Sequence, residues 1–260
     1  MSEIYIENIT FSYPDFSRPI FKNFDLSLPG GITSLVGRNG TGKTTLLLIA
    51  SGILLPQKGR VTICGNDSTS LRDEKERHRY ISFIYQNMEF ETKEDIEVLL
   101  HQVYETGFHE KKDDNFIETL IDVFELKALL KKKSQEVSKG ELQRTILAFS
   151  LLYGSKIIIM DEPIFAMENY QKDIAMGFIY SYAKENGICI IYSVHELDIA
   201  IKFSDNTLLF FKDGSIKLGP TKDILTKENL EAAYQFPFSL MKRKDMMYRI
   251  QLKNKFKKHF

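Results

Sequence analysis

The sequence predicts an α/β fold that combines a parallel sheet, an antiparallel layer at the N-terminus and a helical insertion. Two uninterrupted apolar runs, at 157–160 and 188–192, are typical of strands that are buried on both faces of a parallel sheet. Near the N-terminus, residues alternate at 4–6 and 24–28 as they do in half-buried strands. From residue 89 to residue 152, apolar residues recur at helical spacing instead. A chain of 260 residues is long enough for one large domain with such an insertion.

Composition and charge exclude several classes of protein. Lys and Arg together number 35, as do Asp and Glu together, so the net charge is zero and we expect no nucleic-acid partner. The longest apolar stretch, 46–55, is interrupted by Ser51 and Gly52 and is about half the ~20 residues of a membrane span. The first residues lack the features of a secretory signal, and the only cysteines, Cys64 and Cys189, show no metal-binding spacing. We therefore expect a protein of the reducing cytosol that does not itself cross a bilayer.

After the N-terminal hairpin, a predicted strand at 32–36 leads into a glycine-rich loop. The loop reads Gly37-Arg38-Asn39-Gly40-Thr41-Gly42-Lys43-Thr44, and an apolar helix start follows it at 46–49. Its glycines permit positive φ and the close approach of an anion, which backbone N–H groups and the helix dipole then attract. Lys43 is placed to reach the β- and γ-phosphates, and the Thr44 hydroxyl to bind Mg²⁺. Because a strand precedes the loop and a helix follows it, we interpret it as a phosphate-binding P-loop rather than an ordinary turn.

Two residues outside this loop are candidates for the same site. Tyr13 precedes the P-loop strand and can stack on a purine base, although a packed aromatic side chain is the alternative. Further strands are predicted at 60–64 and 80–85, and Gln86 directly follows the second. A glutamine in this position is often unremarkable, but in a nucleotide site its carbonyl oxygen can reach Mg²⁺ and respond to the γ-phosphate.

The insertion at 89–152 is predicted to be a small helical subdomain. Its charged runs at 91–97 and 131–133 are interpreted as solvated faces rather than sites. A helix is predicted to begin at Ser138, because Glu141 lies three residues later in the pattern of a capping box. On local grounds, this structural role is sufficient.

Acidic residues and a histidine follow the two predicted parallel strands. Asp161 and Glu162 come directly after the run at 157–160, and His195 follows the run at 188–192. Ligands of open α/β sheets bind at the carboxyl ends of strands, and buried carboxylates need a compensating cation. We therefore predict that Asp161 holds Mg²⁺ and that Glu162 binds a water molecule. A lone histidine is usually structural, but its place at this edge favours a functional role for His195.

The remaining predicted elements are a helix near Glu196, a hairpin at 206–211 and 215–218, and a basic tail from Met241 onward. The tail is interpreted either as a solvated helix or as a segment that contacts anionic lipid headgroups. We expect a main domain at 1–225, with its insertion at about 89–152, and a C-terminal helical tail at 226–260.

In their order and spacing, these features resemble the ATP-binding cassette (ABC) ATPase family over about residues 1–225. The segments that carry the resemblance are Tyr13, the P-loop, Gln86, 137–144, Asp161-Glu162-Pro163 and His195. The resemblance implies a P-loop NTPase with a RecA-like core and mixed sheet, an N-terminal antiparallel β subdomain and an inserted helical subdomain. It also implies an ATPase that uses ATP and Mg²⁺.

The resemblance further implies roles for individual residues. Glu162 is expected to polarise the attacking water, and His195 to contact the γ-phosphate. Mg²⁺ is expected to lie among Thr44, Gln86 and Asp161. The residues expected to contact ATP are Tyr13, Gly37, Arg38, Asn39, Gly40, Thr41, Gly42, Lys43, Thr44, Thr45, Gln86, Ser138 and Gly140.

Partners are implied as well. Two cassettes, identical or different, are expected to close head to tail on two ATP molecules, with segment 138–141 of each reaching the ATP that the other binds. The resemblance also implies a separate membrane permease and a cytoplasmic position on the inner face of the cell membrane. The opening residues 4–13 and the stretch 219–236 are similar to importer cassettes, such as those for iron-siderophore, haem and cobalamin uptake.

Two other functions stay open from the sequence. One is a soluble ABC ATPase of iron-sulphur cluster assembly, and the other is a nucleotide-gated module with low turnover. The second is suggested by departures from the family pattern: Lys139 and Glu141 replace a glycine and a glutamine of the LSGGQ signature. Phe165 lacks the usual hydroxyl, and Glu168 is longer than the usual aspartate. The intact catalytic glutamate and histidine instead favour hydrolysis.

Overall fold

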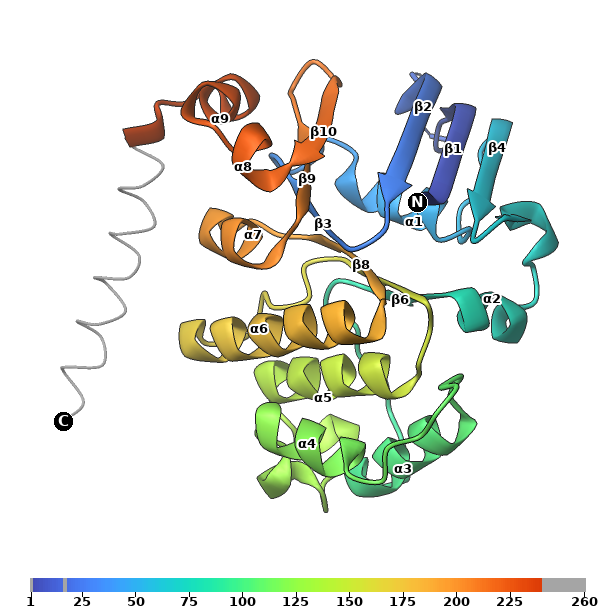
Figure 1. Cartoon of the computed structure of the whole chain (residues 1–260), viewed down its shortest axis with the longest axis vertical. Coiled ribbons are helices and arrows are strands. Elements are labelled where there is room, and N and C mark those ends of the chain that lie inside the picture. Colours follow the sequence, from blue (N-terminus) through green and yellow to red (C-terminus); the bar gives the residue numbers. More distant parts are fainter. Residues whose placement is uncertain (1, 16–17, 240–260) are drawn as a thin grey trace.

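The computed structural model describes residues 2–15 and 18–239 and contains two sheets with helices packed around them (Figure 1). The smaller sheet is antiparallel, and its strands follow the order β2-β1-β4-β5. These strands are β1 (Ser2–Phe11), β2 (Phe21–Pro29), β4 (Lys58–Ile63) and β5 (Asn66–Asp67). The predicted N-terminal hairpin is confirmed, with Ile4 opposite Leu28 and Ile6 opposite Leu26.

The larger sheet is mixed and follows the order β10-β9-β3-β8-β7-β6. Its strands are β3 (Ile32–Val36), β6 (Ile81–Ile84), β7 (Ile157–Met160), β8 (Cys189–Ser193), β9 (Asn206–Phe210) and β10 (Ile216–Pro220). All neighbours pair in parallel except β9 and β10, which form the predicted hairpin. The two apolar runs of the sequence form the adjacent strands β7 and β8, and every residue of both strands is buried.

Alternate residues of β7 contribute to two hydrophobic cores. Ile157 and Ile159 pack with residues of the smaller sheet and of α1 (Lys43–Ala50). Ile158 and Met160 belong to the other core, which includes residues of the helical insertion. Because successive side chains of a strand point to opposite faces, both faces of this sheet are covered. This arrangement explains why the strand is apolar at every position rather than at every second one.

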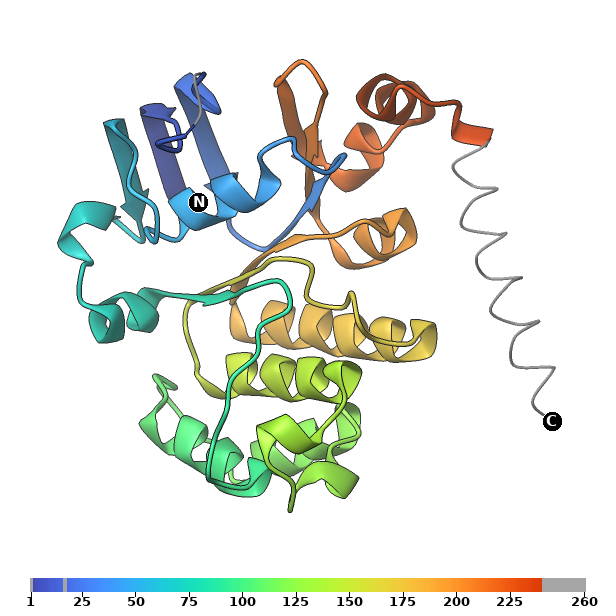
Figure 2. The same cartoon turned by 180° about the vertical axis from the view of Figure 1, so that it is seen from behind.

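The predicted helical insertion is confirmed. It contains α3 (Ile96–Thr106), α4 (Phe116–Val123) and α5 (Lys139–Leu152), which lie at the opposite end of the molecule from the smaller sheet (Figures 1 and 2). Leu100, Leu120 and Leu147 come from these three helices and are fully buried in one core. The same core includes residues of α6 (Asn169–Asn186) and of α7 (Leu197–Phe203), the helix expected near Glu196.

Two helices go beyond what the sequence predicts. The helix α2 (Glu74–Tyr80) has no buried residue, so its sequence shows no apolar pattern. Because this helix includes Tyr80, β6 covers only Ile81–Ile84 and is shorter than the strand expected at 80–85. The helix α6 does carry a signal, because its buried apolar residues recur at helical spacing among polar ones. These residues are Ala175, Met176, Ile179 and Ala183.

The described part of the chain ends with two short helices, α8 (Thr221–Ile224) and α9 (Lys227–Tyr234). Leu230 and Ala233 of α9 are buried in the core of the main body. The domain boundary after residue 225 stays a prediction, and the basic residues from Lys242 onward lie outside the described residues. Within residues 2–15 and 18–239, each helix is too short or too polar to cross a membrane.

Candidate functional site

The P-loop joins the end of β3 to the start of α1 and takes the positive φ angles that its glycines predict. These angles are 153° at Gly37, 77° at Gly40 and 97° at Gly42. A Cβ atom on Gly37 would lie 2.8 Å from the Cβ of Phe210 and 3.0 Å from its carbonyl oxygen, so a larger residue does not fit there. Because Gly42, the N-cap of α1, has no side chain, it offers the first N–H groups of the helix no capping oxygen. The loop therefore has the backbone form that an anion site needs.

Lys43 lies within this loop and is almost fully buried, with 6% of its surface exposed. Its Nζ donates to the carbonyl oxygens of Gly37, at 2.8 Å, and of Arg38, at 3.0 Å. Burial lowers the pKa of Lys43, whereas the nearby carboxylates of Glu162 and Asp161 act in the opposite direction. A phosphate in the loop would give the buried ammonium group a charged acceptor, and such bonds are stronger than bonds to neutral carbonyls.

The exposed rim of the loop is formed by Arg38 and Asn39. The hydroxyl of Thr41 donates to the carbonyl oxygen of Arg38 at 2.8 Å, which ties the turn to itself. The Arg38 side chain reaches the other end of the described chain, where its Nη1 donates to the carbonyl oxygen of Tyr234 at the end of α9, at 3.4 Å. The P-loop is thus in contact with α9 (Lys227–Tyr234), the last helix that the structure describes.

Thr44 and Asp161 form a pair of oxygen ligands of the kind predicted for Mg²⁺. The Thr44 hydroxyl donates to Oδ2 of Asp161 at 2.7 Å, and Asp161 is 3% exposed. In the described ranges, no three His, Cys, Asp or Glu side chains gather into a metal-binding cluster. Mg²⁺ does not need one, because it usually takes one or two carboxylates and completes its shell with waters and substrate phosphates. A hydroxyl and a carboxylate beside a phosphate loop therefore fit this ion.

The carboxylate of Glu162 connects residues from three neighbouring strand ends. Its Oε2 accepts a hydrogen bond from Nε2 of Gln86, which follows β6, at 2.9 Å. Its Oε1 lies 2.7 Å from Nε2 of His195, which follows β8. The Glu162 side chain is 13% exposed and that of His195 35%, so water can approach the pair from the histidine side. The residues that the sequence places at this edge of the sheet do meet there.

Tyr13 lies beside the start of α1. Its hydroxyl is 3.4 Å from Oγ1 of Thr45, and its ring meets Phe11 edge-on, with 5.1 Å between the ring centroids. The position is close to the P-loop, as a base-stacking residue requires. The stacking itself stays a prediction.

Ser138 and Gly140, in contrast, are not brought to the P-loop of their own chain. They lie at the start of α5, in the half of the molecule opposite α1 (Figures 1 and 2). The predicted capping box is confirmed: Oγ of Ser138 accepts from the Glu141 N–H at 3.3 Å, and Oε2 of Glu141 accepts from the Ser138 N–H at 2.7 Å. A Cβ on Gly140 would lie 2.7 Å from the carbonyl oxygen of Ala166, so this helix start packs tightly on the segment after Glu162.

Two further side chains near the site are not singled out by the sequence. Ser193, the last residue of β8, contacts both Asp161 and Glu162. Lys172 of α6 pairs with Glu196 at 2.5 Å and so connects α6 to the residue beside His195. The signals in the sequence are weak: a serine that ends an apolar run, and a lysine inside a mostly polar helix.

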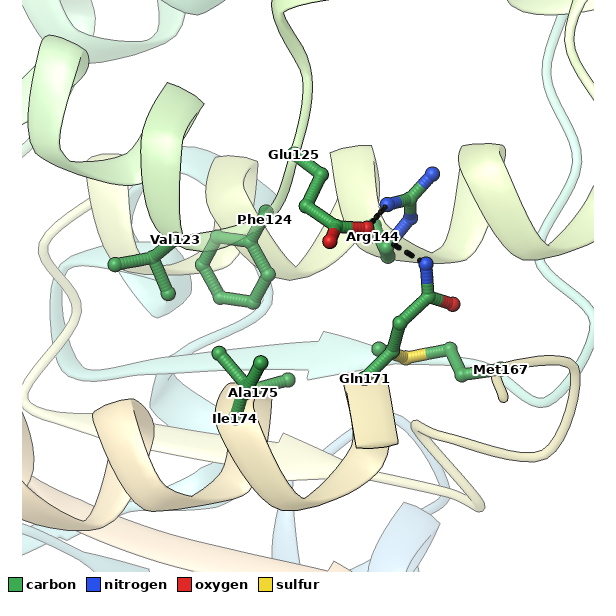
Figure 3. A pocket seen from close by; sticks show the side chains of 8 residues that line it. All are labelled: Val123, Phe124, Glu125, Arg144, Met167, Gln171, Ile174 and Ala175. Atoms are coloured by element: carbon green, nitrogen blue, oxygen red, sulfur yellow. Dashed lines mark hydrogen bonds and ion pairs between the residues drawn. The ribbon is translucent and has the colours of Figure 1, made fainter. Parts of the chain in front are cut away.

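A small hollow lies away from the P-loop, between the helical insertion and α6 (Figure 3). Glu125 bridges it, because its Oε2 accepts from Nη1 of Arg144 at 2.5 Å and from Nε2 of Gln171 at 2.8 Å. Its other lining residues are mainly apolar: Val123, Phe124, Met167, Ile174 and Ala175. These hydrogen bonds join α5, the helix that Ser138 caps, to the first turn of α6.

Comparisons with known proteins show which family this chain is similar to. Residues 21–165 match the family model described as ABC transporter. A putative ABC transporter ATP-binding protein of Archaeoglobus fulgidus is 27% identical over 229 residues, which cover 87% of this chain and 94% of that protein. A molybdate import ATP-binding protein of Haemophilus influenzae is 26% identical, with 89% of this chain and 88% of that protein covered.

A solved structure with a similar fold is a dimeric, post-hydrolysis ATP-binding cassette bound to ADP and Pi. The TM-score is 0.71 at 22% identity, and the match covers 84% of this chain and 98% of that one. This likeness concerns the fold, and it confirms the predicted P-loop core with its mixed sheet and antiparallel layer.

Proposed function

This chain belongs to the ABC transporter family, and from that premise we propose that it is the ATP-hydrolysing subunit that powers transport of a solute through a separate membrane permease. The family assignment confirms the predicted resemblance and the predicted enzyme class, an ATPase. The observation that carries the proposal is the position of Glu162. Its carboxylate is held between Gln86 and His195, beside a loop built to bind phosphate.

Each group of this site has a role in hydrolysis. The P-loop N–H groups and Lys43 bind the triphosphate and withdraw charge from it. A water molecule placed at Glu162 gives a proton to the carboxylate as its oxygen bonds to the γ-phosphorus, and the carboxyl group later returns this proton to the released phosphate. The bond from phosphorus to the bridging oxygen breaks, and ADP and phosphate are released. His195 orients the carboxylate through the oxygen that Gln86 does not use, and its proposed second role is to contact the γ-phosphate.

Mg²⁺ would be held by Thr44, Asp161 and, as the family resemblance implies, Gln86, and when bound it would neutralise charge on the phosphate oxygens. The direct contact of the Thr44 hydroxyl with Asp161 already brings the two oxygens to one place. Asp161 follows a fully buried strand and is itself buried, so the protein shields its carboxylate from bulk water.

We further propose that the start of α5 serves the ATP of a second cassette. The separation of the start of α5 from α1 and its P-loop supports this role, because a second subunit could bring its own P-loop there. The side chain of Phe165 is 60% exposed next to this helix start, which agrees with a surface that meets a partner. We propose import as the direction, since a relative matched over 88% of its length is named a molybdate import ATP-binding protein.

The direct test is to isolate the tagged chain from membranes and to measure phosphate release from ATP by the captured complex. We expect a permease to co-purify, to be identified by mass spectrometry, and turnover to stop when a chelator removes divalent cations. A chain recovered without any membrane protein would favour the soluble assembly ATPase instead. A complex that binds ATP but releases no phosphate would favour the low-turnover module.

A further inference from the structure

We propose that Ser193 positions Glu162 for hydrolysis, by joining the backbone of Glu162 to the carboxylate of Asp161 through a single hydroxyl group. This inference rests on the proposed function, since it concerns the residue that binds the attacking water. Ser193 would be a positioning residue, because its hydroxyl bonds to Asp161 and to the backbone of Glu162.

The register of the larger sheet brings these residues together. The strands β7 and β8 run in parallel, and Met160 lies opposite Tyr192. One residue further along, Asp161 and Ser193 are therefore neighbours at the carboxyl ends of the two strands. Ser193 is completely buried, so its hydroxyl must find its partners within the protein.

The Ser193 hydroxyl uses both of its hydrogen-bonding capacities. It donates to Oδ1 of Asp161 and accepts from the backbone N–H of Glu162, the second at 2.9 Å. The other carboxylate oxygen of Asp161 accepts from Thr44. A continuous chain of bonds thus runs from the P-loop helix, through Asp161 and Ser193, to the residue that binds water.

The backbone of Glu162 needs such a restraint. Its φ is 50°, in the left-handed region, where a residue other than glycine is strained. A strained conformation of this kind persists only where its surroundings hold it. The side-chain oxygens are held by Gln86 and His195, and the Ser193 hydroxyl is the contact that holds the N–H.

Loss of the hydroxyl should therefore act on catalysis rather than on ATP binding. The N–H of Glu162 and Oδ1 of Asp161 would each lose a buried hydrogen-bond partner, and the backbone at Glu162 would relax from its strained conformation. A shift of about 1 Å in a catalytic group can lower a rate about 100-fold. The Lys43 ammonium group bonds to the loop carbonyls of Gly37 and Arg38, whereas the Ser193 hydroxyl bonds to Asp161 and Glu162, so the P-loop should bind ATP as before.

The test compares Ser193→Val with Ser193→Thr. The valine and threonine side chains have nearly the same shape, but only threonine carries a hydroxyl group. We expect the valine variant to lower kcat about 10- to 100-fold, with KM and the equilibrium affinity for ATP changed less than about twofold. The threonine variant should keep most of the wild-type kcat. Ser193→Ala, which adds no bulk, should behave like the valine variant and serves if the added methyl group prevents folding.

Ser34→Val is the matched control. Ser34 is equally buried, and its hydroxyl bonds to that of Thr207 at 2.9 Å, on strands β3 and β9 of the same sheet. Its replacement removes a buried hydroxyl bond away from Glu162, so it should lower the melting temperature without a selective fall in kcat. A second control combines Ser193→Val with Glu162→Gln. This double variant should hydrolyse ATP at the same rate as Glu162→Gln alone, because the serine then has no catalytic carboxylate to position.

The possible outcomes separate this inference from the proposed function. If the wild type hydrolyses ATP but the valine and threonine variants have equal kcat, Ser193 does not position Glu162. The same conclusion follows if the valine change and Glu162→Gln lower the rate independently, or if the valine change weakens ATP binding instead of kcat. Absence of hydrolysis by the wild-type complex would overturn the proposed function and this inference with it.

Discussion

Replacement of Glu162 by glutamine is expected to lower ATP hydrolysis about 100- to 1,000-fold while ATP binding is kept. Glutamine has nearly the same shape, but its amide cannot draw a proton from the attacking water as a carboxylate does. The P-loop, Lys43 and the pair formed by Thr44 and Asp161 are unchanged by the substitution, so the nucleotide should bind and remain as ATP. Phosphate release and equilibrium binding of ATP, measured on the same preparation, separate the two effects.

Glu185→Gln provides the control, because it makes the same chemical change on the exposed surface of α6. It should hydrolyse ATP at the wild-type rate. Equal and near-zero rates in the wild type and in Glu162→Gln would remove the claim that the chain is an ATPase. A Glu162→Gln variant as fast as the wild type would show that another group activates the water.

Replacement of Lys43 by alanine is expected to weaken ATP binding at least about 100-fold, which corresponds to about 2.7 kcal/mol. The ammonium group is buried inside the loop and would be the principal cation for the phosphates. Without it, the loop carbonyls of Gly37 and Arg38 would face the phosphates with no positive charge between them. Isothermal titration calorimetry with ATP measures this loss of affinity.

Lys202→Ala is the matched control for this experiment. Lys202 is exposed on α7 and pairs with Asp173 at the surface, so its removal should leave ATP affinity within about twofold. If Lys43→Ala bound ATP as tightly as the wild type, the nucleotide would have to lie elsewhere, and the P-loop assignment would be wrong.

The parts of the site that the sequence predicts well are those that depend on local order. The P-loop is one contiguous segment whose glycines, lysine and threonine act over eight residues. The meeting of Gln86, Glu162 and His195 follows from a general rule, since the carboxyl ends of parallel strands share one edge of the sheet. The capping box at Ser138 is also local and forms as expected.

Features that depend on tertiary contacts could not be predicted from the local sequence. The role of Ser193 requires the register in which β7 pairs with β8, and a serine at the end of an apolar run does not reveal it. The helix α2 buries none of its residues, so it leaves no apolar pattern. The contact of Arg38 with α9 joins residues that are 196 positions apart, and nothing local in the sequence predicts it.

In the mechanism proposed for this chain, a triphosphate held by the P-loop of one subunit binds it to a second subunit. Sedimentation of the Glu162→Gln variant with ATP and Mg²⁺, compared with the same protein with ADP, measures whether this dimer forms. We expect a particle of about twice the 30.1 kDa chain mass with ATP and of one chain mass with ADP. A variant that binds ATP yet remains single, even when its permease is supplied, would contradict it.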